Sequence, residues 1–89
     1  MDFYDVAAKL PVAKRYFSEG CILLNQGRSK DAGAKFNATL DIYKSFAESG
    51  DGRVSYHFGI EIKEGIKNSK IMLEKAFYKS RKAARGITD

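Results

Sequence analysis

Residues 13–46 read AKRYFSEGCILLNQGRSKDAGAKFNATLDIYKSF, and they carry the strongest structural signal in the sequence. Two small residues, Gly20 and Ala32, stand where two helices folded back on each other would bring their backbones together. Larger residues that would fill the seam are Tyr16, Leu23, Phe36 and Leu40. The spacing predicts a helical hairpin, in which a short loop joins two antiparallel helices.

The first helix of this hairpin is predicted over residues 11–26. Its apolar residues recur at spacings of three and four, which is typical of an amphipathic helix. Pro11 suits the first turn, where its missing N–H has no partner to lose. Residues 2–10 also have helical spacing, so a short N-terminal helix before Pro11 is a further option. Gly27 can take the left-handed conformation that closes a helix.

The second helix is predicted over residues 29–48. Ser29 is a candidate cap for its first turn, and Asp31 favours the positive end of the helix dipole. Its apolar stripe includes Ala32, Phe36 and Tyr43. The loop between the helices has about four residues, which makes them antiparallel neighbours.

Ser49-Gly50-Asp51-Gly52 is a break, and the segment after it is ambiguous. Apolar residues alternate from Val54 to Ile62, which taken alone indicates a strand. A lone strand would leave its backbone groups unpaired, because no other segment offers a partner. We therefore favour one long helix over residues 54–84, with Gly86 as its terminator. The first turns of this helix would be apolar on two sides, which is typical of a helix that contacts two neighbours or a second copy.

Together these elements predict an all-α fold, an antiparallel three-helix bundle with helices at roughly 11–26, 29–48 and 54–84. The 89 residues are expected to form a single helical domain, 1–89. No second copy of the 13–46 pattern follows, so the chain is not a tandem array.

The hairpin resembles a single tetratricopeptide (TPR) repeat, which has the same length of 34 residues. It departs from the pattern at Glu19, where a leucine is expected, and at Lys44, where a proline is expected. A hairpin closed by a third helix is also similar to the MIT (microtubule-interacting and transport) domain. Both resemblances imply a non-catalytic domain that binds segments of partner proteins between its helices. The matching residues are Tyr16, Gly20, Leu23, Gly27, Ala32, Phe36, Thr39 and Leu40.

Charge and cysteine content narrow the compartment and the partners. The formal net charge is +5, and residues 70–89 hold six basic and two acidic residues. The basicity is therefore concentrated at the C-terminal end. Cys21 is the only cysteine and cannot form an internal disulfide, which favours a reducing, cytoplasmic location. No apolar run approaches the ~20 residues of a membrane span, and the acidic start is unlike a signal peptide.

No residue pattern indicates a reaction, a cofactor or a metal, so we expect a protein that is not an enzyme. His57 is the only histidine, and a metal site there would need carboxylates alone as further ligands. Cys21 is interpreted as a buried small hydrophobe, because a nucleophile would need His57 as its base. Glu61 and Glu64 lie three apart on a helix and are interpreted as part of a solvated face beside Lys63.

The predicted function is that of an adaptor, a protein-interaction module that binds a partner segment in a groove between helices. In the repeat resemblance, Lys14, Phe17 and Asn25 match positions that hold a peptide, whereas Cys21 and Leu24 are expected in the core. A basic stripe on the last helix suits a protein or peptide partner of acidic character. The stripe comprises Lys75, Lys79, Lys82 and Arg85.

Two alternatives stay open. The basic stripe could meet the phosphates of a nucleic acid, although nothing in it reads bases. The apolar start of the third helix, residues 54–62, could pair with a second copy in a homo-oligomer, which would make the protein a self-assembling structural element.

Overall fold

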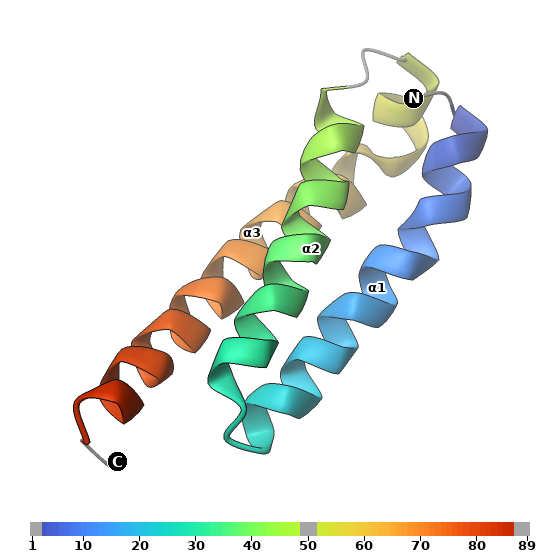
Figure 1. Cartoon of the computed structure of the whole chain (residues 1–89). Helices are drawn as coiled ribbons and strands as arrows, with labels where there is room; N and C mark the ends of the chain where they lie inside the picture. The colour runs from blue at the N-terminus through green and yellow to red at the C-terminus, as the bar shows by residue number, and fades with distance from the viewer. Residues whose placement is uncertain (1–2, 49–51, 87–89) are drawn as a thin grey trace.

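The computed structural model describes residues 3–48 and 52–86, which form three α-helices. They are α1 (Phe3–Asn25), α2 (Ser29–Ala47) and α3 (Gly52–Ala84). The helices build a slender bundle with extents of 48 × 16 × 16 Å (Figure 1). Successive helices run antiparallel, so α1 and α3 run in the same direction on either side of α2 (Figure 1). The predicted all-α three-helix bundle is confirmed.

The hairpin of α1 and α2 closes as its small residues predict. A Cβ atom placed on Gly20 would lie 2.7 Å from Cε1 of Phe36, closer than real side-chain contacts allow. The Phe36 ring therefore occupies the space that Gly20 leaves open, and it is fully buried. Ala32 is fully buried as well. Glu19 departs from the repeat pattern, but its carboxylate lies 2.8 Å from the Lys35 ammonium and links the two helices.

The α1–α2 turn confirms one predicted cap and corrects another. Gly27 has a φ of 78°, and the N–H of Arg28 donates to the Leu23 carbonyl at 2.9 Å, as in a Schellman motif. Ser29 was expected to cap α2, and this was wrong because Ser29 is already the first helical residue. Arg28 takes the cap position without a side-chain cap bond, and its guanidinium contacts the Asp31 carboxylate at 2.7 Å.

The start of α1 differs from the sequence prediction. One helix runs from Phe3 through Pro11, so the expected start at 11 was wrong. The segment before Pro11, for which a separate short helix was one option, is the first part of α1. Proline removes one backbone hydrogen bond inside a helix. The helix continues because Val6 and Leu10 before the proline and Ala13 after it are all buried in the bundle. Tertiary packing therefore overrides the local helix-breaking tendency of Pro11.

Residues 54–62 are helical, which resolves the ambiguity between strand and helix. Val54, Phe58 and Ile62 lie four residues apart and pack toward α1 and α2. Tyr56 and Ile60 stand on the opposite side, and 84% and 81% of their surfaces are exposed. The alternation thus reflects a helix with an apolar inner face and two apolar residues on its outer face. α3 ends before Gly86, whose φ of 72° confirms the predicted terminator.

The core has two clusters along the bundle. The first joins the early part of α1 to the end of α2 and the start of α3, through Val6, Leu10, Tyr43, Phe46 and Ile62. The second lies near the α1–α2 turn and is covered by the later part of α3. Its members are Leu24, Ala32, Phe36 and Ala76, with Phe17, Cys21, Leu23, Met72 and Leu73 packed against them. α3 therefore covers the apolar face that a solitary hairpin could not bury alone.

Candidate functional site: the groove between α1 and α3

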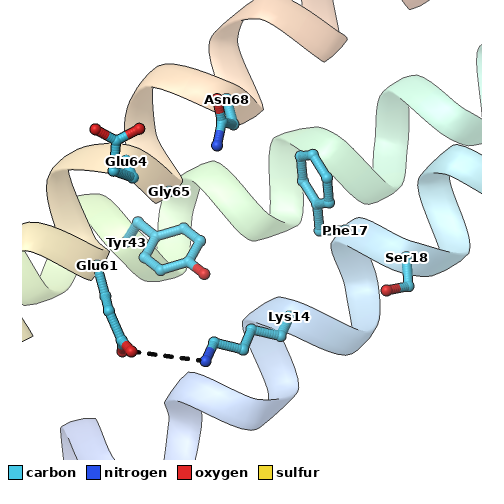
Figure 2. Close-up of a pocket in the computed structure, with 8 residues that line it drawn as sticks. All are labelled: Lys14, Phe17, Ser18, Tyr43, Glu61, Glu64, Gly65 and Asn68. Carbon is cyan, nitrogen blue, oxygen red and sulfur yellow. Dashed lines mark ion pairs between the residues drawn. The ribbon is translucent and has the colours of Figure 1, made fainter.

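A groove runs between α1 and α3, which contact each other less extensively than either contacts α2. Its volume is about 350 Å³, and Tyr43 of α2 forms its floor (Figure 2). One wall comes from α1 and the other from α3. The lining residues are Lys14, Phe17, Ser18, Tyr43, Glu61, Glu64, Gly65 and Asn68.

The floor of the groove depends on Gly65. A Cβ atom at this position would lie 2.5 Å from Cζ of Tyr43, so a residue with a side chain would collide with the ring. The Tyr43 ring passes beneath α3 at this point, and its hydroxyl faces the space between α1 and α3 (Figure 2). Tyr43 is buried, and its ring packs edge-on against Phe46 at 6.1 Å between centroids. Burial raises the pKa of the Tyr43 phenol, and the nearby Glu61 carboxylate raises it further.

An ion pair spans the groove. The Lys14 ammonium lies 3.9 Å from a Glu61 carboxylate oxygen, and both side chains are at least half exposed (Figure 2). Exposed pairs of this kind contribute about 0–1 kcal/mol. A partner could therefore open the pair at little cost and use both charges. Glu64 and Asn68 add a carboxylate and an amide on the α3 side of the groove.

Phe17 connects the groove to the core. The residue is half-buried, and its ring lies edge-on to Phe36 with centroids 5.5 Å apart. One part of the ring is thus held by the second core cluster, while the residue also lines the groove (Figure 2). A side chain fixed in this way offers an apolar surface without losing rotamer freedom when a partner binds.

The two edges of the groove continue toward the far end of the bundle. On α1, steps of three and four residues place Ser18, Cys21 and Asn25 in line with Lys14. On α3 the same steps carry the edge from Asn68 through Met72 to Lys75 and Lys79. Cys21 and Met72 both pack against the second core cluster, and neither lines the groove.

The residues predicted from the sequence therefore fall into two groups. Lys14 and Phe17 both line the groove. The other predicted binding residues lie beyond Met72, at the end of the bundle where α1 finishes. Asn25, Lys75, Lys79 and Arg85 are exposed there. Lys82 is half-buried, and its ammonium lies 5.0 Å from the centre of the Tyr78 ring. Cys21 and Leu24 pack in the core as expected.

Sequence reasoning missed most of the groove. The sequence places Tyr43 only in an apolar stripe, and Glu61 and Glu64 only on a solvated face. Asn68 carried no signal, because its role depends on which helices lie side by side. Gly65 offered one usable hint. A glycine inside a helix costs about 0.5–1 kcal/mol relative to alanine, and it often marks a place where another element approaches closely.

Other hollows lie between α2 and α3. One is formed by residues near the start of α3, including Phe46, Val54 and Ile60, and has a volume of about 400 Å³. Another of about 380 Å³ lies near the end of α3 and includes Gly33, Leu73 and Phe77. Neither combines an aromatic floor with ionised side chains on both walls. Among residues 3–48 and 52–86, no three His, Cys, Asp or Glu side chains gather closely enough to hold a metal ion.

Comparison with protein-family models found no match, and comparisons with curated proteins and with solved structures found no significant match either. Within the described part of the chain, no helix combines the length and apolar character that crossing a membrane requires. The fold class and the groove geometry are therefore the basis for any assignment of function.

Proposed function

We propose that this domain is a protein-interaction module that binds a segment of a partner protein in the groove between α1 and α3. The observation that carries the proposal is the groove itself, with the aromatic floor of Tyr43 beneath an exposed Lys14–Glu61 pair. Grooves between helices commonly take helical or extended segments through a few apolar anchors. The resemblance of residues 13–46 to a TPR repeat, closed by a third helix as in MIT domains, supports the same proposal.

Charge along the groove specifies the segment further. Glu61 and Glu64 make the α3 wall acidic near Tyr43, whereas Lys75 and Lys79 make its continuation basic. A complementary segment carries an apolar side chain against Tyr43 and Phe17, and a basic side chain beside Glu64. Its acidic side chains lie toward Lys75 and Lys79. Complementary charge of this kind fixes orientation and raises the rate of association more than it raises affinity.

A display library of random 15-residue peptides tests the proposal without knowledge of the natural partner. Selection uses the wild-type domain and counter-selection uses Ser18→Trp, whose indole fills the groove. Ala8→Trp is the matched control, because Ala8 is exposed on α1 and lies outside the groove. We expect enriched peptides that bind wild type and Ala8→Trp but lose at least tenfold in affinity for Ser18→Trp. Equal binding to all three proteins would contradict the groove as the site.

A second candidate function is nucleic-acid binding by the end of α3. The favouring observation is that Phe77 and Tyr78, 57% and 55% exposed, stand among the exposed basic residues Lys75, Lys79 and Arg85. Aromatic side chains can stack on unpaired bases, while basic ones meet phosphates. Titration with a fluorescent single-stranded oligonucleotide at 20 mM and 200 mM salt tests it. Binding that weakens steeply with salt supports this function, and absence of binding at the lower salt eliminates it.

A further inference from the structure

The outer face of α3 carries a second pattern that lies outside the core and shares only Glu64 with the groove. Its residues recur at alternating steps of three and four, which is the spacing of a seam between two paired helices. All of them are exposed, and 81% of the surface of Ile60 is open to solvent. The seam consists of Arg53, His57, Ile60, Glu64, Lys67, Ile71, Glu74 and Tyr78.

This seam is complementary to itself when two copies of α3 lie antiparallel. With the two-fold axis between Glu64 and Lys67, each Glu64 faces Lys67 of the second copy. Ile60 then faces Ile71, His57 faces Glu74, and Arg53 faces the Tyr78 ring. Tyr56 and Phe77, 84% and 57% exposed, flank the ends of the seam. The facing side chains are therefore compatible in every layer. The central layers pair opposite charges, and the next pair two apolar side chains. The outer layers pair an imidazole with a carboxylate and a cation with an aromatic ring.

Other arrangements lose this match. A parallel pair would set Glu64 against Glu64 and Lys67 against Lys67, and like charges in facing positions are destabilising. Sliding the antiparallel pair by one heptad sets Glu64 against Glu74 in one direction and His57 against Lys67 in the other. Charge complementarity therefore selects a single orientation and a single register.

We propose that the domain forms an antiparallel homodimer through the outer face of α3. Residues 53–78 run about 39 Å at 1.5 Å per residue. A seam of this length and about 10 Å in width covers roughly half of the ~800 Å² that each partner buries in a standard interface. We expect a weak dimer, with a dissociation constant of about 10–500 μM. Of the groove residues, only Glu64 lies in the seam.

Sedimentation equilibrium between 10 μM and 1 mM tests the dimer with charge-reversal variants. Glu64→Lys and Lys67→Glu each place like charges together twice in the symmetric pair, so each variant alone should associate about tenfold more weakly. The double variant should recover wild-type association, and so should an equimolar mixture of the two single variants. Lys9→Glu on α1 is the control for net charge and should dimerise as wild type does, because Lys9 is exposed and outside the seam.

Circular dichroism verifies that each variant is folded, which its exposed positions lead us to expect. A wild-type chain that stays strictly monomeric at 1 mM would overturn the proposal. A dimer that is unchanged by Glu64→Lys, or that the double variant fails to restore, would place the contact elsewhere and would also overturn it.

Discussion

At the scale of single residues, two glycines decide how closely the helices approach. Gly20 leaves room for the buried ring of Phe36, and Gly65 leaves room for Tyr43. The first contact holds the hairpin together, and the second shapes the floor of the groove. The close approach at Gly20 could be predicted from the hairpin pattern. The close approach at Gly65 follows only from the packing of α3 against α2.

Substitution of Gly20 measures this close approach. Gly20→Ala should lower the free energy of unfolding by about 1–3 kcal/mol, because Phe36 is fully buried and cannot move aside. Gly59→Ala is the matched control, since Gly59 is also inside a helix but has no atom within 4 Å of the added Cβ. It should stabilise the fold by about 0.5–1 kcal/mol. Urea unfolding measures both, and a stabilising Gly20→Ala would contradict the packing of this hairpin.

Tyr43 makes stability depend on alkaline pH. Its pKa is raised in the folded state by burial and by Glu61. Well below pH 10 the phenol is neutral in both folded and unfolded chains, so its contribution is fully present there. Above pH 10 the unfolded chain ionises first and stability falls. We expect Tyr43→Phe to lose less stability than wild type between pH 9 and pH 11 in urea unfolding, and an identical loss would count against the buried phenol.

At the scale of elements, the sequence predicted three helices but misjudged where some of them begin. Periodicity identified α2 and the α1–α2 loop closely, because both depend on local spacing and on Gly27. The start of α1 was missed, since the helix passes through Pro11 only with the support of buried neighbours such as Leu10 and Ala13. Segment 54–62 was ambiguous because its outward-facing Tyr56 and Ile60 imitate the alternation of a strand.

Pro11 provides a prediction about α1 as an element. Pro11 is exposed, so Pro11→Ala restores a backbone donor inside the helix without disturbing a core contact. It should raise the free energy of unfolding by about 1–3 kcal/mol, which is the usual penalty for proline in a helix interior. Thermal unfolding followed by circular dichroism measures the change. A lower melting temperature for Pro11→Ala would mean that α1 does not continue through this position.

At the scale of the whole molecule, α3 determines what the hairpin can do. It covers the apolar face of the hairpin near Phe36 and leaves a groove beside α1 near Tyr43. Its outer face carries the seam that we propose pairs with a second copy. That Lys14 and Phe17 share one surface could be predicted, because they belong to one helix and one local pattern. The carboxylates on the other wall could not, because they meet α1 only after the third helix folds back.

The most direct test of the groove is amide chemical-shift mapping by NMR with a peptide from the selection described above. The account predicts that the largest shifts fall on residues 14–18 of α1 and 61–68 of α3, and that they vanish with Ser18→Trp but persist with Ala8→Trp. Largest shifts along α2, near Gly33 and Asn37, or at the end of α3 around Phe77 and Tyr78, would contradict the proposed site.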